Sequence, residues 1–77
     1  MIYYMCKNDF LNYPAYRKKS FPVFAGELFT EKEVVKYDLP LQSNKFIKVK
    51  ANETDTYFVF GCRRFLKGSR FEVLGEN

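Results

Sequence analysis

The chain has no histidine and no tryptophan, and its four glycines stand apart from one another. Without histidine, the commonest general base is missing, together with every Ser-His or Cys-His pair that activates a nucleophile. Isolated glycines cannot form the glycine-rich loop that cradles a phosphate. The sequence therefore predicts a protein without catalytic activity and without a bound cofactor.

Cysteine is scarce too: there are only two, Cys6 and Cys62. Structural zinc sites use four cysteine or histidine ligands, so no such site is expected. The N-terminus has neither the basic segment nor the long apolar segment of a secretory signal, which predicts a cytoplasmic protein. In that setting both thiols are expected to be reduced and packed.

No apolar run approaches the ~20 residues of a membrane helix, so no membrane association is expected. Nine phenylalanines and six tyrosines are present instead, and they can give a short chain a core of large side chains. A length of 77 residues predicts one domain over residues 1–77, with a core over 1–74 and a frayed tail over 75–77. The net charge of +4 is a mild bias that permits an anionic partner without requiring one.

The first half of the chain predicts short strands around one helix. Strands are expected over residues 2–7 and 21–24, separated by an exposed loop over 8–20 and followed by a tight turn over 25–27. Thr30 and Glu33 have the spacing of a capping box, so a helix is expected near residues 31–37. Phe29 and Val34 fit a hydrophobic staple around that cap, and Val34 with Val35 is expected to dock on a sheet. Glu27, Glu31 and Glu33 are interpreted as helix-start charges.

The second half predicts a hairpin. Residues 45–50 alternate, placing Ile47 and Val49 on one face, and residues 56–60 are expected to return antiparallel after a polar turn over 51–55. Phe58 and Phe60 are expected to be buried, and Gly61 marks the end of their strand or a bulge. A last strand is expected over residues 70–74.

These elements predict a mostly β, α+β fold. The expected architecture is a small, strongly bent antiparallel sheet of four or five strands, an SH3-like partial barrel with one short helix. The runner-up is an open sheet with the helix packed across one face.

Two motifs carry a resemblance to a family. Residues 26–33 read GELFTEKE and residues 56–65 read TYFVFGCRRF. They are similar to the GELxTxxE and TYFxFGxRF motifs of small proteins encoded on phages and conjugative elements of Gram-positive bacteria. The resemblance covers roughly residues 1–65; residues 67–77 extend beyond it, and Cys62-Arg63-Arg64 departs from the commoner Ala-Arg. It implies a bacterial, cytoplasmic setting and a mobile-element origin.

The loop over residues 8–20 contains the best candidates for contact with a protein partner. Tyrosine and arginine are enriched at interface hot spots, and here they stand beside a proline and two lysines. The candidate contact residues are Tyr13, Tyr16, Arg17, Lys18 and Lys19. The alternative is that both tyrosines fold back over the core. Recognition of proline-rich peptides is not expected, since an SH3-type groove needs a tryptophan.

A second set of residues would suit single-stranded nucleic acid, since an aromatic ring between basic side chains can stack on a base and pair phosphates. This holds if the strand presents its aromatic and basic side chains to solvent. The candidates are Phe46, Lys48, Lys50, Arg63 and Arg64. The sequence thus favours a non-enzymatic accessory or adaptor protein that binds another protein. The alternatives are a weak nucleic-acid binder and a structural protein that self-associates as a homodimer.

Overall fold

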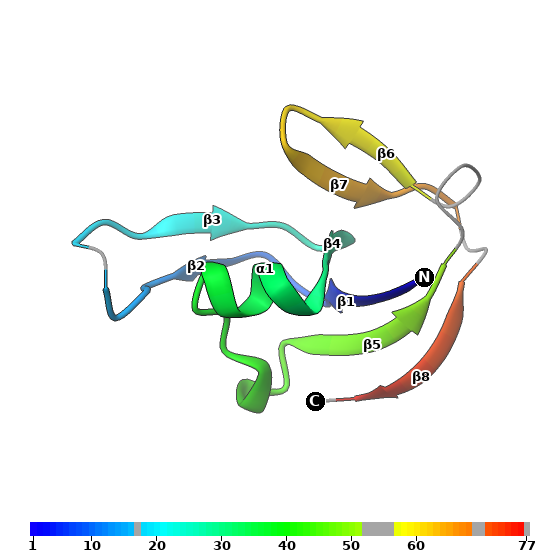
Figure 1. Cartoon of the computed structure of the whole chain (residues 1–77), viewed down its shortest axis with the longest axis horizontal. Helices are drawn as coiled ribbons and strands as arrows, with labels where there is room; N and C mark the ends of the chain where they lie inside the picture. The colour runs from blue at the N-terminus through cyan, green and yellow to red at the C-terminus, as the bar shows by residue number, and fades with distance from the viewer. Residues whose placement is uncertain (17, 52–56, 69–70, 77) are drawn as a thin grey trace.

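The computed structural model describes residues 1–16, 18–51, 57–68 and 71–76 of the chain. Six of its strands form one antiparallel sheet in the order β6-β7-β4-β1-β5-β8, and β2 and β3 form a separate two-stranded sheet (Figure 1). The elements in chain order are β1 (Ile2–Cys6), β2 (Phe10–Asn12), β3 (Phe21–Val23), β4 (Glu27–Phe29), α1 (Glu31–Lys36), the 3₁₀ turn η1 (Leu41–Ser43), β5 (Phe46–Lys50), β6 (Tyr57–Phe60), β7 (Arg63–Leu66) and β8 (Glu72–Glu76).

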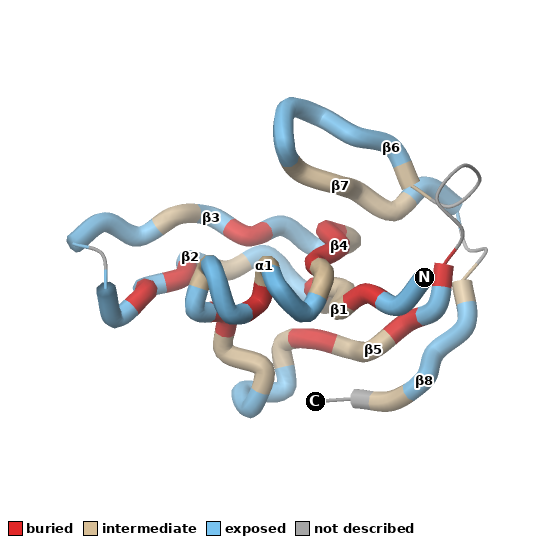
Figure 2. The backbone as a smooth tube through the Cα atoms, in the orientation of Figure 1, coloured by how far each residue is buried: buried red, intermediate tan, exposed pale blue. Residues whose placement is uncertain are grey.

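The centre of the large sheet is β1, which pairs with β5 along its whole length and with β4 at Tyr4 and Met5. Because side chains alternate across a strand, β1 supplies apolar groups to both faces of the sheet. Tyr4 and Cys6 point to one face, and Tyr3 and Met5 point to the other. Figure 2 shows the buried positions concentrated in β1, β4 and β5, with β6 exposed.

One face is covered by α1 and the β2–β3 hairpin. Phe46 is fully buried there, with Phe10 and Phe29 packed edge-on to its ring at centroid distances of 5.8 and 6.1 Å. Edge-to-face contacts of this kind add to the burial of the rings themselves. The buried residues of this cluster are Cys6, Val23, Phe29, Val34, Leu39 and Phe46.

The opposite face has a smaller cluster of Tyr3, Leu28, Val49 and Ala51. Ile47 packs against it, which confirms that Ile47 and Val49 share a face. Tyr57 reaches this cluster from β6, with its ring centroid 5.7 Å from that of Tyr3. The sheet is therefore packed on both faces at its centre.

The helix start is confirmed. The Glu33 amide donates to Thr30 Oγ1 at 3.2 Å, and the Thr30 amide donates to Glu33 Oε1 at 2.9 Å, which completes the capping box. Phe29 and Val34 lie in the same cluster, as the staple spacing predicts. Val35 does not dock: it is 76% exposed, because consecutive helical residues point about 100° apart.

The predicted hairpin of residues 45–50 with 56–60 is wrong. Both sides of β5 are occupied by β1 and β8, and β6 pairs instead with β7. The predicted burial of Phe58 and Phe60 is wrong as well, since they are 49% and 75% exposed. The tight turn at Gly61 and Cys62 brings β7 back against β6, so these two strands pair. As a result β6 is an edge strand of the sheet and does not lie beside β5.

Three smaller expectations also change. The loop over residues 8–20 contains β2, whose Phe10 lies opposite Val23 of β3. Gly75 and Glu76, expected to fray, belong to β8, where they lie opposite Lys48 and Ile47 of β5. The last strand therefore begins and ends two residues later than predicted. The predicted turn over 51–55 falls mostly on residues 52–56, outside the described residues.

The fold is mostly β with one short helix, as predicted, but the SH3-like closure is not confirmed. Within the described residues, β6 and β8 end the large sheet and do not pair with each other. The runner-up, an open sheet with a helix on one face, is closer to the observed arrangement. None of the described helices is long and apolar enough to cross a bilayer.

Two substitutions of the same kind test this division of the aromatics. Phe46→Ala removes a fully buried ring and is expected to destabilise the fold by about 3–5 kcal/mol. Phe60→Ala removes a ring that is 75% exposed, and its effect is expected to stay within about 0.5 kcal/mol. Urea denaturation followed by circular dichroism measures both. Equal losses from the two variants would contradict the observed packing.

Candidate protein-binding surface

The β6–β7 hairpin presents three consecutive exposed apolar residues, Phe58, Val59 and Phe60. Its two-residue turn consists of Gly61 and Cys62, and Gly61 has a φ of 67°. A positive φ at the first turn residue alone fits the type II′ turn, whose twist matches that of the flanking strands. Glycine is therefore required at this position, and the turn fixes the register that places Phe60 opposite Arg63.

The outer strand of this hairpin, β6, has no charged side chain. Phe58, Val59 and Phe60 are 49%, 61% and 75% exposed, and the nearby Phe24 is 42% exposed. We call these four residues the aromatic edge. Phe65 of β7 supports it, with its ring stacked on Phe58 at 5.7 Å and tilted against Phe24 at 6.5 Å. Figure 1 shows the hairpin at one end of the sheet.

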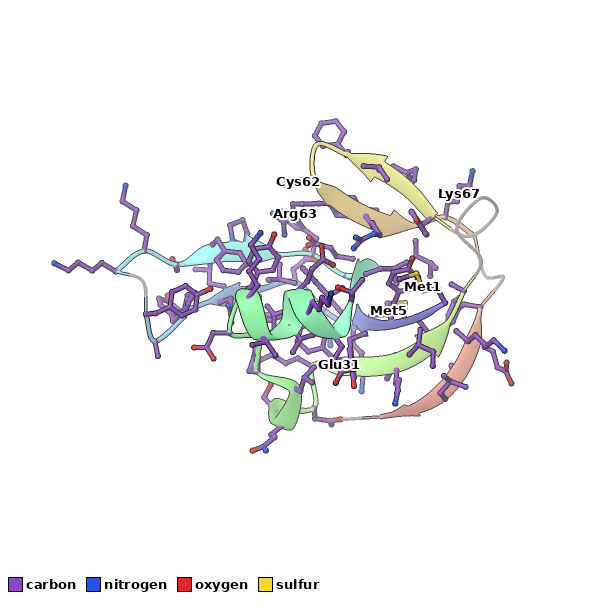
Figure 3. All side chains as sticks on the ribbon, viewed as in Figure 1. Met1, Met5, Glu31, Cys62, Arg63 and Lys67 are labelled. Carbon is purple, nitrogen blue, oxygen red and sulfur yellow. The ribbon has the colours of Figure 1, made fainter. Side chains whose placement is uncertain are left out.

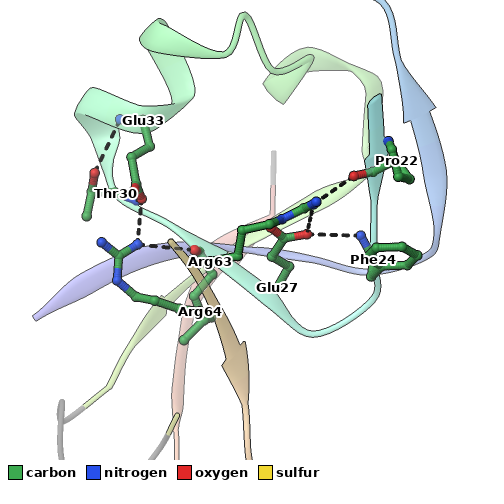
Figure 4. Close-up of polar contacts among 8 residues, drawn as sticks. Pro22, Phe24, Glu27, Thr30, Glu33, Arg63 and Arg64 are labelled. Atoms are coloured by element: carbon green, nitrogen blue, oxygen red, sulfur yellow. Dashed lines mark hydrogen bonds and ion pairs between the residues drawn. The ribbon is translucent and has the colours of Figure 1, made fainter. Parts of the chain in front are cut away.

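Arg63 attaches the hairpin to the rest of the fold (Figure 4). Its guanidinium donates two hydrogen bonds to the carboxylate of Glu27, which is completely buried in β4. It also donates to the carbonyl of Pro22 at 2.7 Å, and the same Glu27 carboxylate accepts from the Phe24 amide at 3.1 Å. One ion pair thus connects β7, β4 and β3.

Arg64 makes a second attachment. Its Nη1 donates to Glu33 Oε1 of α1 at 2.5 Å, and its guanidinium carbon lies 5.5 Å from the centroid of the Tyr3 ring. Burial on its own would raise the pKa of Glu33, but hydrogen bonds from Arg64 and Thr30 outweigh it and hold the pKa below its ordinary value of 4.5. Glu33 therefore both completes the capping box of α1 and binds Arg64 of β7.

A cavity of about 140 Å³ lies between α1 and the start of β7. Phe21, Phe29 and Tyr37 line it, with Cys62 and the two ion pairs Arg63–Glu27 and Arg64–Glu33. Figure 3 shows Cys62 and Arg63 at the turn end of the hairpin. Because each guanidinium is already neutralised by a carboxylate, the cavity offers no uncompensated charge to a ligand.

The loop tyrosines are partly exposed and partly attached. Tyr13 is 73% exposed and Tyr16 is 57% exposed, yet the Tyr16 hydroxyl donates to the carbonyl of Lys36. Pro14 between them is buried, and the Ala15 amide donates to Asp38 Oδ2 at 2.8 Å. The loop is therefore held against the end of α1 and presents Tyr13 outward. Lys18 and Lys19 are exposed, and Arg17 lies outside the described residues.

The residues proposed for nucleic-acid contact do not form one surface. Phe46 cannot stack on a base because it is fully buried in the core, so the condition that it faces solvent is not met. Lys50 is exposed and Lys48 is half-buried on β5, whereas Arg63 and Arg64 on β7 are engaged with carboxylates. Because β5 lies inside the sheet, it contributes a buried residue to each face, Phe46 to one and Val49 to the other.

The two thiols are free, as predicted, but only Cys6 is packed. Burial raises the pKa of the Cys6 thiol to about 11, so it stays protonated at neutral pH, and its Sγ donates to the Asn8 carbonyl at 2.9 Å. Cys62 is exposed at the hairpin turn. Among the described residues, no group of three or more Cys, Asp or Glu side chains is close enough to hold a metal ion.

Sequence reasoning missed two residues of this site: the buried Glu27, which binds Arg63, and the exposed Phe24. Glu27 was assigned to the helix start, although it lies in β4 with its side chain buried against Arg63. The available signal was an acidic residue between Gly26 and Leu28 in a strand-prone segment, together with an arginine pair downstream. Pairing the two segments requires knowledge of the sheet order, which neither motif contains.

Comparison with protein-family models, with curated proteins and with solved structures gave no match. The surface is therefore interpreted from its own geometry.

Removing the charge partner of Glu27 should destabilise the fold. Arg63→Met leaves a buried carboxylate uncompensated and is expected to reduce the free energy of unfolding by about 3 kcal/mol. Adding Glu27→Gln to that variant removes the stranded charge and should restore part of the loss. Urea denaturation measures both. A stability for Arg63→Met within about 0.5 kcal/mol of the parent would show that the pair is unimportant.

Glu33 should make the fold sensitive to acid. Because its pKa is lower in the folded chain, the unfolded chain takes up the proton first as the pH falls. The stabilisation is therefore complete above the unfolded value of 4.5 and is lost as the pH falls through the lower folded value. Glu33→Gln lacks this contribution, so its melting temperature should fall less steeply below that pH. If the melting temperatures of the parent and of Glu33→Gln fall in parallel as the pH is lowered, Glu33 is not the source of the acid sensitivity.

Proposed function

We propose that this chain is a non-enzymatic accessory or adaptor protein that binds a protein partner along β6. The observation that carries the proposal is an uncharged strand with exposed aromatic side chains at the open end of the sheet. Natural proteins guard such edges with lysine, proline, bulges or a covering loop, because an open edge pairs readily with another chain. Residues 57–60 include no lysine and no proline.

The opposite end of the sheet provides a comparison. β8 also exposes Val73 and Leu74, but the charged and exposed Glu72 stands beside them, and the register of the pairing of β8 with β5 shifts between Lys48 and Val49. Charge and irregular register are both features that discourage strand addition. The two ends of one sheet thus differ in the way expected if β6 is a contact surface.

The electrostatics around β6 also favour a protein over an anionic polymer. Arg63 and Arg64 are the cations of the adjacent strand, and both are paired with glutamates. Aromatic side chains, phenylalanine included, are enriched at the cores of protein interfaces. In strand addition the backbone supplies affinity, and the alternating side chains supply selectivity.

The loop around Tyr13 is a second contact surface in this proposal. Its backbone is held by the Asn12 side chain, which donates to the Tyr37 carbonyl at 2.9 Å, and by the bond from Ala15 to Asp38. A loop that is already ordered loses little conformational entropy on binding. The exposed Lys18 and Lys19 would attract an acidic partner surface. The mobile-element, cytoplasmic setting is part of the proposal and is supported by the GELxTxxE and TYFxFGxRF resemblance.

The test compares two substitutions of the same chemistry. Val59→Lys places a charge on β6, and Val35→Lys places one on the exposed face of α1, where the valine is 76% exposed. Each variant is immobilised, a bacterial lysate is passed over it, and every protein retained by the parent is purified and titrated directly. Val59→Lys is expected to weaken that affinity at least about tenfold and Val35→Lys to leave it within about twofold.

Tyr13→Ser in the same titration measures the contribution of the loop. Its melting temperature should match that of the parent, since the ring is 73% exposed. If Val59→Lys binds the purified partner as well as the parent does, β6 is not the contact surface.

A further inference from the structure

The exposed edge of β6 also suits a second copy of this chain as its partner. This inference rests on the proposed function, because it identifies the protein that adds to β6. The chain has a net charge of +4, so two copies repel each other wherever their charged surfaces meet. At β6 that repulsion is smallest, since residues 57–60 are uncharged and the neighbouring arginines are neutralised by Glu27 and Glu33.

The backbone of β6 is arranged for strand addition. Phe60 and Arg63 flank the two-residue turn, so they form a hydrogen-bonded pair of the hairpin, and Phe58 with Phe65 is the next such pair. By the alternation of an antiparallel ladder, the backbone groups of Tyr57 and Val59 point to the open side. No described strand occupies that side.

We propose that two copies of the chain associate by antiparallel, two-fold pairing of their β6 strands, centred on Val59. In this register the outward backbone groups of each Val59 meet those of its copy. Phe58 of each chain then lies opposite Phe60 of the other, which brings four phenylalanines together on one face. A register centred on Phe58 would instead place Phe60 opposite Thr56 and lose both aromatic pairs.

The exposed area sets the strength of this contact. A fully exposed aromatic side chain offers on the order of 200 Å², so the aromatic edge presents about 400 Å² of apolar surface per copy. Even if all of it became buried, two copies would bury on the order of 800 Å² through these side chains, below the roughly 1,200–2,000 Å² of stable complexes. An interface of this size is typical of weak, transient association, so we expect a dissociation constant between roughly 10 and 100 µM.

Three valine-to-lysine variants test the proposal by analytical ultracentrifugation of the full chain, from about 5 µM to about 500 µM to span that expected constant. Reductant is present throughout, because the exposed Cys62 could otherwise link copies covalently. The parent is expected to show a monomer–dimer equilibrium. Val59→Lys should raise the dissociation constant at least about tenfold, because two lysines then face each other across the two-fold axis.

Two of the variants are matched controls. Val35→Lys on α1 and Val73→Lys on β8 add the same charge at valines that are 76% and 56% exposed. Both should leave the dissociation constant within about twofold. If Val73→Lys weakens association as much as Val59→Lys does, and species larger than dimers appear, β6 pairs head-to-tail with β8 and the two-fold proposal is overturned. A parent that stays monomeric throughout the range overturns it too.

A spectroscopic distance gives a second readout. Cys62 is exposed, whereas Cys6 is buried with a raised pKa, so a thiol-reactive nitroxide labels Cys62 selectively. The turn places each Cys62 about two strand rises, roughly 7 Å, along β6 from the two-fold centre and roughly 7 Å to the side, near the line of β7. The two Cα atoms are therefore expected roughly 20 Å apart across the axis. Double electron–electron resonance on the labelled parent should show this short distance, and Val59→Lys should abolish it.

The outcomes separate this inference from the proposed function. If Val59→Lys loses affinity for a purified partner and the parent never dimerises, the adaptor function is supported and self-pairing is overturned. Dimerisation abolished by Val59→Lys, with unchanged affinity for the purified partner, supports self-pairing and overturns β6 as the adaptor surface.

Discussion

The ion pair between Arg63 and Glu27 is the contact on which the arrangement of this small fold depends. The carboxylate is completely buried, and a buried charge is tolerated only when it is paired and hydrogen-bonded. Arg63 satisfies it from β7, the Phe24 amide satisfies it from the end of β3, and Arg63 itself reaches the Pro22 carbonyl. Because β7 pairs with β4 at only two positions, this polar contact determines where the β6–β7 hairpin lies relative to the body of the sheet.

The fold has two distinct ends as a result. Its centre, at β4, β1 and β5, is packed on both faces by two clusters of aromatic and aliphatic side chains. The end at β6 presents aromatic side chains to solvent, while the end at β8 includes charged residues and an irregular register. In a chain of 77 residues, aromatic side chains are the main source of burial, so leaving three on the surface near one strand sacrifices stability. The proposed binding role of β6 would account for that arrangement.

The parts of the fold that could be predicted are the local ones. The capping box of Thr30 and Glu33, the alternation of Ile47 and Val49, the positive φ of Gly26 and the first strand all depend on residues close together in the chain. The candidate site was predicted less well. Tyr13 is exposed as expected, but Phe46 is buried, and the arginines expected to bind phosphate hold the sheet together instead. Each of these outcomes depends on a partner more than 30 positions away or on the order of the strands.

The sequence by itself determined a mostly β domain with one capped helix, a core rich in phenylalanine and tyrosine, and a chain without histidine chemistry. These follow from composition and short-range spacing, which act before any long-range contact forms. Only the tertiary structure decided which strand each strand pairs with, and therefore which aromatic side chains are buried. An alternating strand has the same pattern at the centre of a sheet and at its edge, because the pattern records two faces and not the neighbours on either side. For that reason the exposure of Phe58 and Phe60 became visible only once β6 was placed at the end of the sheet.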